Sequence, residues 1–214
     1  MAGKMFTFDP LSIFFLFVIF VVCLPAAVYS IGYMKGEYSN RKTIMAWALF
    51  FGFVLSMAFV VIVNNVFAFL IAWEAMSLVS YFLIVLDTKH EKSIRAGMVY
   101  IVMTHAGTAF LTAAFLLMYK YAGSFEFPAV KAACQAMPPY IRKLLFLLLL
   151  TGFGTKAGIV PMHIWLPYAH PQAPSHISSV MSGVMIKTAI YGLARFVIYM
   201  LGPGPSWWGI SIIV

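Results

Sequence analysis

The sequence predicts an all-α transmembrane protein: a multi-helix bundle of about six full spans and the start of a seventh, with one discontinuous helix. Hydrophobic residues make up 63% of the 214-residue chain and charged residues only 9%, whereas soluble domains are about 25% charged. The apolar runs are long enough to cross a bilayer. One run is interrupted by glycines and prolines between Gly152 and Pro174.

The spans follow one another with short polar links. The first covers about Leu11 to Ile31. From Thr43 to Leu86 the chain is almost continuously apolar for 44 residues, which suits two antiparallel helices joined by a tight turn at Asn64 and Asn65. Further spans are expected at Ala96–Tyr119, from Leu144 into the broken segment, at Ser175–Leu201 and, in its first turns only, from Trp207 onward, while residues 120–143 form an extramembrane loop.

The net charge of +8 does not indicate a nucleic-acid partner. Most basic residues lie in the links, where they set membrane orientation or meet anionic lipid headgroups. The links that hold residues 35–42 and 89–95 are expected on the cytoplasmic side, in a multi-pass protein of the cell inner (cytoplasmic) membrane. Met1 to Pro10 is short and polar and precedes a run too long for a signal peptide, so no cleaved leader is expected.

Ionisable side chains fall near the middle of four spans. The centre of a ~30 Å hydrocarbon layer lies about 10 residues from either end of a helix. Glu74, His105, Lys156 and Lys187 lie 10 to 13 residues beyond the preceding polar link, loop or proline. Because each charge at that depth costs at least ~2.5–3.5 kcal/mol, such residues are typically functional and face protein or water. A lone histidine such as His105 is equally often a hydrogen-bonded packing residue.

These residue types favour proton transfer. Burial favours the neutral forms of Glu and Lys, and pairing restores their charged forms. Bringing Glu74 and Lys156 together or apart would therefore release or load a proton, and a row of such groups is a proton relay. Lys187 belongs to a four-residue repeat that also contains Ser179, Gly183, Tyr191 and Arg195, predicted to face the bundle interior or a hydrated path. Arg195 is an equally good helix-end anchor.

The broken segment surrounds Lys156 with Gly152, Gly154 and Gly158, and Pro161 ends the helix. Freed backbone carbonyls at membrane depth are tolerated where they are buried in protein or line a water-filled cavity, and discontinuous helices often mark transport sites. The alternative is an interfacial loop. His163 and His170 are seven residues apart, which does not match a helical metal pair, and the cysteines, Cys23 and Cys134, also lack metal-site spacing.

The stretch "FGTKAGIVPMHIWLPYAHPQAPSHISSVMSGVMIKTAIYGLARF" resembles the signature of the antiporter-like membrane subunits of respiratory complex I, multisubunit cation/proton antiporters and membrane-bound hydrogenases. Its form "AHPQAPSH" is most similar to the large membrane subunit of hydrogenase-4 and formate hydrogenlyase. "WEAMSLVSYFLI" and "FDPLSIFFLFVI" resemble the family's fifth and third helices. One departure is Tyr168, where many members carry Asp.

The resemblance implies one inverted repeat of the antiporter-like fold plus one helix. Residues 1–214 would then be a single membrane domain, an N-terminal fragment or half of such a subunit. Glu74 would be the glutamate of the fifth family helix, Lys156 the lysine of the broken seventh and Lys187 that of the eighth, which form the input half of a proton channel. His163 and His170 belong to the same pattern and, with His105, are candidate proton carriers.

The function expected from this resemblance is proton, or other ion, translocation as a subunit of a membrane-bound redox complex, driven by electron transfer in a soluble arm. The expected partners are other membrane subunits: further antiporter-like subunits, a quinone- or hydrogenase-module anchor subunit, and lipid. No catalytic centre, metal, flavin, iron–sulfur cluster or other cofactor is expected in this chain. Two alternatives remain open: a stand-alone Na⁺/H⁺ antiporter component, and a degenerate half-subunit that anchors the redox arm.

Overall fold

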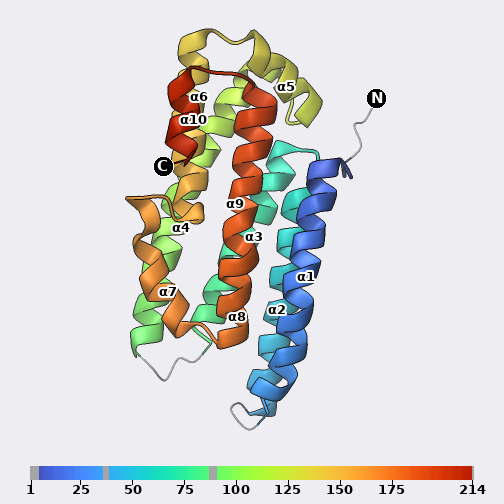
Figure 1. Cartoon of the computed structure of the whole chain (residues 1–214), viewed down its shortest axis with the longest axis vertical. Helices are drawn as coiled ribbons and strands as arrows, with labels where there is room; N and C mark the ends of the chain where they lie inside the picture. The colour runs from blue at the N-terminus through green and yellow to red at the C-terminus, as the bar shows by residue number, and fades with distance from the viewer. Residues whose placement is uncertain (1–4, 36–38, 87–90, 214) are drawn as a thin grey trace.

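A computed structural model describes residues 5–35, 39–86 and 91–213, and these form a helical bundle (Figure 1). In chain order the elements are α1 (Pro10–Tyr33), α2 (Asn40–Ile62), α3 (Val66–Ile84), α4 (Glu91–Ala122), α5 (Phe127–Ala136), α6 (Pro139–Ala157), η1 (Met162–Trp165), α7 (Leu166–Gln172), α8 (Ser175–Val180), η2 (Met181–Met185), α9 (Ile186–Gly192), η3 (Leu193–Leu201) and α10 (Ser206–Ile213). η1 is a 3₁₀ turn, whereas η2 and η3 are π-helical. The predicted all-α class is confirmed.

Six segments of the described chain are long and apolar enough to cross a membrane. They correspond to the six predicted spans, and the fifth of them, Pro139–Gln172, contains the break between α6 and α7. The sixth, Ser175–Leu201, runs through α8, η2, α9 and η3 as one long rod. α10 lies where the start of a seventh span was expected.

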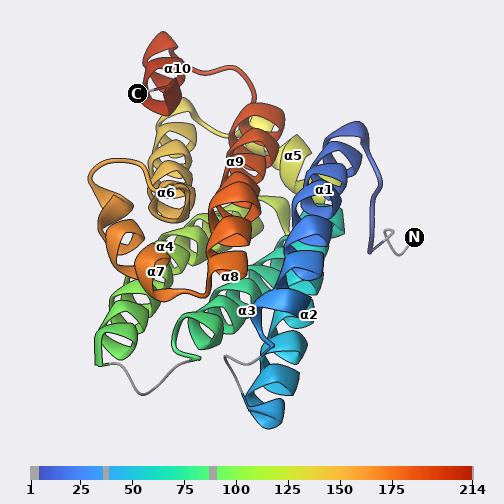
Figure 2. The same cartoon turned by 60° about the horizontal axis from the view of Figure 1, so that its bottom comes forward.

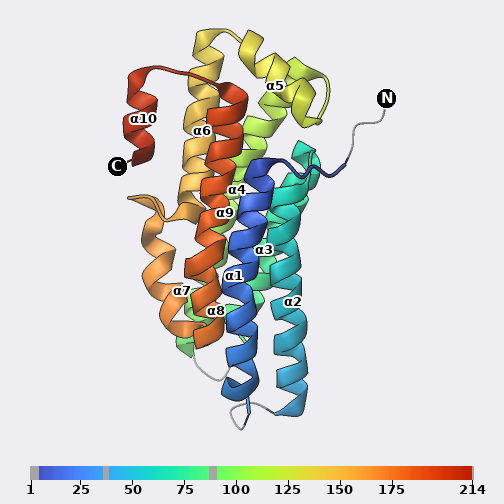
Figure 3. The ribbon, with the colours of Figure 1, turned by 45° about the vertical axis from the view of Figure 1, so that its right-hand side comes forward.

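The α3 helix and the α8–η3 rod occupy the middle of the bundle. Figure 2 shows them between the α1–α2 pair and the group formed by α4, α6 and α7. α3 packs against both α2 and α4, and α1 packs against α2 and α8 (Figure 3). α1 and α3 end, and α2 and α4 begin, at one end of the bundle, whereas α5 and the α2–α3 turn lie at the other.

Polar side chains fix the ends of two spans. Asp9 precedes Pro10 and accepts a hydrogen bond from the Ser12 backbone N–H (2.9 Å), so it caps α1. Asn65 accepts from the backbone N–H groups of Phe67 and Ala68 (2.9 and 3.1 Å), so it caps α3. The predicted turn between the second and third spans is therefore present, and Asn65 is the residue that starts the next helix.

The segment expected to be a loop, residues 120–143, has more helix than its sequence suggested. It holds the end of α4, all of α5 and the first turn of α6. α5 begins with Pro128 in its first turn and buries Phe127, Val130 and Cys134 on one face, and this spacing of three and four residues is that of an amphipathic helix. The position of this segment outside the membrane remains a prediction.

Glycines let α4 and α6 approach closely. A Cβ atom on Gly152 would lie 2.5 Å from Leu111 Cδ2 and 2.9 Å from the Gly107 carbonyl oxygen. A Cβ on Gly107 would in turn lie 2.9 Å from Thr155 Cβ. Small residues at such crossings are the usual way in which membrane helices pack. This contact holds the end of α6, and with it Lys156, against the bundle.

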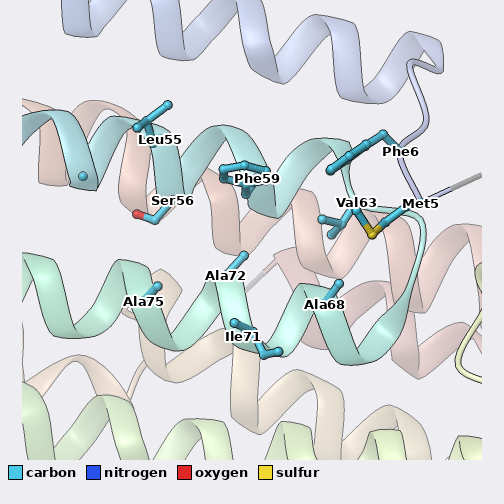
Figure 4. Close-up of a pocket in the computed structure, with 11 residues that line it drawn as sticks. Met5, Phe6, Leu55, Ser56, Phe59, Val63, Ala68, Ile71, Ala72 and Ala75 are labelled. Atoms are coloured by element: carbon cyan, nitrogen blue, oxygen red, sulfur yellow. The ribbon is translucent and has the colours of Figure 1, made fainter.

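An apolar groove runs along the outer side of α2 and α3. It encloses about 440 Å³, and the small residues Gly52, Ala68 and Ala75 leave room for it. Met5 and Phe6 lie at one end of the groove (Figure 4). Ser56 is its one polar lining side chain, and the Ser56 hydroxyl donates to its own helix backbone. The polar chemistry of α3 therefore lies on other faces of that helix.

Candidate functional site

Lys156 is the most deeply buried charged residue of the described chain. It lies in the last turn of α6, which ends at Gly158, where a φ of +79° is a left-handed value that favours glycine. The Lys156 side chain is 1% exposed. Its Nζ donates a hydrogen bond to Ser77 Oγ on α3 and lies 4.9 Å from the centroid of the Trp73 ring. A hydroxyl and an aromatic face thus replace part of the hydration of the amine.

At the break after α6, a side chain donates a hydrogen bond to a backbone carbonyl that the helix leaves free. The Thr155 carbonyl, which loses its helical partner where α6 ends, accepts a hydrogen bond of 2.7 Å from Trp165 Nε1. The Gly154 carbonyl accepts from the backbone N–H groups of Gly158 and Ile159. The prediction of freed carbonyls in this segment is therefore correct, and the Thr155 carbonyl is satisfied by protein.

Glu74 lies on α3, one turn before Ser77, and its direct partner is His105 on α4. Glu74 Oε2 lies 3.2 Å from His105 Nε2, while Glu74 Oε1 is buried and has no hydrogen-bond partner among the described residues. Glu74 also interacts electrostatically with Lys156. The structure therefore brings three predicted residues together. Lys156 donates its hydrogen bond to Ser77, however, and Glu74 contacts His105.

His105 contacts its own helix through one ring nitrogen and Glu74 through the other. Its Nδ1 lies 3.0 Å from the Ile101 carbonyl oxygen, and its Nε2 lies 3.2 Å from Glu74 Oε2. A carboxylate and an imidazole are both groups that can carry a proton. The pair lies on a face that is half open, since 48% of the His105 side chain is exposed.

Lys187 lies apart from these three residues. It is exposed on the outer side of α9, and its Nζ donates a 2.7 Å hydrogen bond to the Ser182 carbonyl, five residues earlier. The neighbouring Thr188 is buried and contacts Met76 Sδ of α3 at 3.5 Å. Lys187 therefore does not share the buried face of Tyr191 and Arg195 in this chain, and the alternative that it faces a hydrated path stays a prediction.

Lys187 and Tyr191 both lie in α9, which is an ordinary α-helix. At 3.6 residues per turn, a residue four positions on lies about 40° further around the helix, so a four-residue repeat does not stay on one face. The rod also packs against α5 and α6 around η3. The π-helical stretches η2 and η3 flank α9, and the sequence gives no clear signal for them.

The other two predicted histidines flank the break. His163 lies in η1, and its Nδ1 is buried without a hydrogen-bond partner in the described structure. His170 lies in α7, where its ring stacks on Trp165 and its Nδ1 lies 3.0 Å from Ser178 Oγ. Both are therefore close to the broken segment, and their role as proton carriers remains a prediction.

An ion pair between Arg195 and Asp9 was not foreseen. Two guanidinium nitrogens of Arg195 contact both carboxylate oxygens of Asp9, and a third bond joins Arg195 to Ser12 Oγ at 3.1 Å. Arg195 is 3% exposed. Its hydrogen bond, assisted by the Ser12 N–H, lowers the pKa of Asp9 to about 2. The sequence marks Asp9 as a helix cap, but nothing in it indicates a partner near the other end of the chain.

Ser77 and Trp73 were also missed as parts of the site. Ser77 lies three residues after Glu74 in the motif "WEAMS", so the helical repeat already places it near Glu74. Trp73 directly precedes Glu74, and the sequence holds no comparable signal for it. Among the residues of known placement, no group of three His, Cys, Asp or Glu side chains could hold a metal ion. The arrangement can hold and exchange protons between a carboxylate, an imidazole and an amine.

The fold and this site define a class: a multi-pass membrane protein with a buried lysine at a helix break and a carboxylate–imidazole pair beside it. The family model described as "NADH:quinone oxidoreductase/Mrp antiporter, TM" matches residues 63–214. A second, described as "NADH-Ubiquinone oxidoreductase (complex I), chain 5 N-terminus", matches residues 4–42. The chain belongs to this family of antiporter-like membrane subunits.

Several relatives are similar over most of the chain. Hydrogenase-4 component B of Escherichia coli is 39% identical over 95% of this chain and 30% of its own length. NAD(P)H-quinone oxidoreductase chain 4 1 of Picosynechococcus is 32% identical over 76% of this chain and 32% of its own length. A chain of the archaeal membrane-bound sulfane sulfur reductase superposes with a TM-score of 0.76 at 27% identity, covering 91% of this chain and 30% of that one. The chain thus spans about a third of the length of these relatives.

Proposed function

We propose that this chain translocates protons as an antiporter-like subunit of a membrane-bound redox complex. Electron transfer in a separate soluble arm would drive proton movement through Glu74, Lys156 and Lys187. The observation that carries the proposal is the buried Lys156 amine at the helix break, with the contacting pair of Glu74 and His105 near it. Relatives named as a hydrogenase component and as quinone oxidoreductase chains support the redox setting.

Glu74 and Lys156 can influence each other's charge because Lys156 is buried and Glu74 is partly buried, where the effective dielectric constant is lower than in water. An anionic Glu74 favours the ammonium form of Lys156, whereas a protonated Glu74 removes that support. A movement that changes the distance between them would therefore load or release the proton of Lys156. Lys187 would take the proton onward at the outer face of α9.

Two polar faces of this chain need protein neighbours. Lys187 is exposed at membrane depth, and so is half of the His105 side chain. An ionisable group at the centre of a bilayer faces protein or water rather than lipid. We therefore propose that other membrane subunits, or further helices of the same assembly, cover the α9 face and the α3–α4 face. The complex would lie in the cytoplasmic membrane with the two basic links on the cytoplasmic side.

The test is proton movement by the assembled complex. Inside-out membrane vesicles carrying Lys156→Ala or Glu74→Ala would be compared with wild type for electron-transfer rate and for proton uptake reported by a pH-sensitive dye. Lys143→Ala is the matched control, because Lys143 lies on the same helix but is exposed near its other end. Both site variants should lose coupled proton uptake while the control keeps it.

Other outcomes identify the alternatives. Unchanged proton uptake in both variants overturns the proposal. Na⁺-dependent proton exchange without any electron donor would instead identify a stand-alone antiporter component. If Lys187→Ala leaves turnover and proton uptake intact, while deletion of the chain dissociates the complex, the chain is an anchor for the redox arm.

A further inference from the structure

Lys156 is sealed from solvent, so any proton that reaches it must pass through protein. Beyond its partner Ser77, two more hydroxyl groups lie toward the end of the bundle that holds the α3–α4 link. They belong to Ser80, one turn further along α3, and to Tyr100 of α4. All three hydroxyl residues are 0% exposed.

Two of these hydroxyl groups, those of Ser80 and Tyr100, contact each other, and the third, that of Ser77, lies one turn away on α3 and donates to the Trp73 carbonyl at 3.0 Å. Ser80 Oγ lies 2.6 Å from Tyr100 Oη, at a distance where either atom can be the donor. Ser80 Oγ also lies 3.0 Å from the Ser77 carbonyl, and Ser77 Oγ accepts from Lys156 Nζ. Only one turn of α3 therefore separates the Lys156 amine from the Ser80–Tyr100 pair.

The Ser80–Tyr100 pair has two satisfied hydrogen arrangements. In one, Ser80 donates to the Met76 carbonyl at 2.7 Å and Tyr100 donates to Ser80. In the other, Ser80 donates to Tyr100, and Tyr100 donates to the Met185 thioether at 3.5 Å. Carbonyl oxygens and thioether sulfurs only accept, so both hydroxyls keep a partner in either arrangement. A hydroxyl that can reverse its direction without losing a partner can pass a proton along a chain.

We propose that Tyr100, Ser80 and Ser77 deliver protons to Lys156 from the α3–α4 end of the bundle, an inference that rests on the proposed function of Lys156. A proton bonds to the Tyr100 oxygen as the original Tyr100 hydrogen moves to Ser80. The hydrogen of Ser80 passes to a water molecule that would bridge the one-turn gap, and that water gives one of its own hydrogens to Ser77 Oγ. The original Ser77 hydrogen leaves the Trp73 carbonyl and bonds to the neutral Lys156 amine. Each hydroxyl gains one hydrogen and loses one, and the net change is one ammonium ion at Lys156.

The route continues toward the surface along the same face of α4. Ser93 lies seven residues before Tyr100, is 3% exposed, and donates to Gln172 Oε1 at 3.3 Å. Gln172 lines a surface pocket of about 290 Å³. Two helical turns, about 10 Å, separate Ser93 from Tyr100 along α4, and the Tyr100 side chain leans toward the helix N-terminus and shortens that gap. Water entering at this pocket would supply the chain.

The test compares Tyr100→Phe and Ser80→Ala with Thr104→Val in the assembled complex. Tyr100→Phe removes one oxygen but keeps the ring that packs 5.1 Å from the Trp165 ring. Thr104 is the matched control, because its hydroxyl is also buried on α4 but donates to backbone carbonyls of its own helix. Coupled proton uptake should fall about tenfold in both relay variants, equivalent to about 1.4 kcal/mol on one transfer barrier, and Thr104→Val should match wild type.

A second readout separates a relay from a packing effect. Slowing one proton transfer makes that step limiting, so the ratio of rates in H₂O and D₂O should rise in Tyr100→Phe and stay at the wild-type value in Thr104→Val. If Lys156→Ala abolishes uptake but Tyr100→Phe and Ser80→Ala do not slow it, this route is wrong and the proposed function stands. Uptake that survives Lys156→Ala overturns the proposed function itself. Equal losses in Thr104→Val and Tyr100→Phe, with no change in isotope effect, also overturn the route.

Discussion

Arg195 of η3 forms an ion pair with Asp9, the residue that caps α1, although 186 positions of the chain separate them. The pair joins the first and last of the six spans, and Tyr191 extends it by donating to the Val61 carbonyl at the end of α2 (2.9 Å). Side-chain contacts therefore join three spans, α1, α2 and Ser175–Leu201, at one end of the bundle. The opposite end holds the access side of the proposed relay.

Asp9→Asn should destabilise the protein. It leaves a buried guanidinium without its counter-charge, and breaking such a pair costs about 3–5 kcal/mol. Because Asp9 is partly exposed, we expect a loss near the lower value in the free energy of unfolding, measured by denaturant titration in detergent. The control is Glu91→Gln, an exposed acid at the start of α4. An equal stability for the two variants would contradict the structural role of the pair.

Acid should remove the same stabilisation. The pKa of Asp9 falls from 3.8 to about 2 on folding, so the folded protein binds the proton more weakly than the unfolded chain does. The contribution of Asp9 is then fully present above pH ~4 and is lost as the pH falls to ~2. The difference in thermal midpoint between wild type and Asp9→Asn should shrink across this window. A difference that stays constant from pH 5 to pH ~2 would refute the assignment.

Glu74→Gln should impair proton movement more than His105→Gln does. The first change removes the group that interacts with Lys156, whereas the second leaves the carboxylate in place. We expect about a 100-fold loss of coupled uptake for Glu74→Gln, the lower range for a positioned proton-transfer group, and a smaller loss for His105→Gln. Dye-reported uptake in inside-out vesicles measures both, and the reverse order would show that His105 is the essential partner.

Gly152→Ala should separate α4 from α6. The added methyl group would meet Leu111 Cδ2 at 2.5 Å and the Gly107 carbonyl at 2.9 Å, and overpacking of this kind costs about 1–3 kcal/mol. Gly32→Ala is the control, since a Cβ there would meet nothing within 4 Å. Thermal unfolding in detergent should show the loss in the first variant alone, and adding Leu111→Ala should restore part of it.

The sequence predicted the six spans because they depend on local pattern, and the depth of the ionisable groups within the membrane stays a prediction. Apolar run lengths define the six spans, and Asn65 and Gly158 mark ends that capping chemistry explains. It also predicted a carboxylate near Lys156. These features follow from bilayer thickness and helix geometry, which act on every stretch of the chain alike.

Tertiary pairings were not predictable in this way. The sequence alone did not indicate that His105 would take the carboxylate that Lys156 was expected to hold, or that Asp9 would reach Arg195. Lys187 does not share the buried face of Tyr191 and Arg195, because each four-residue step turns about 40° past one full α-helical turn and packing decides which residues are covered. In each case the outcome depends on which neighbouring helix lies closest, a property of packing rather than of spacing.

The exposed Lys187 would link the folding of this chain to the proposed assembly. A lysine that faces lipid at mid-membrane costs at least ~2.5–3.5 kcal/mol, and the hydrogen bond to the Ser182 carbonyl would offset only part of that cost. A neighbour that covers α9 and supplies an acceptor would offset the rest, and binding to the folded chain would then stabilise it by mass action. The cation proposed to carry a proton in the complex would thus also lower the stability of each unassembled copy.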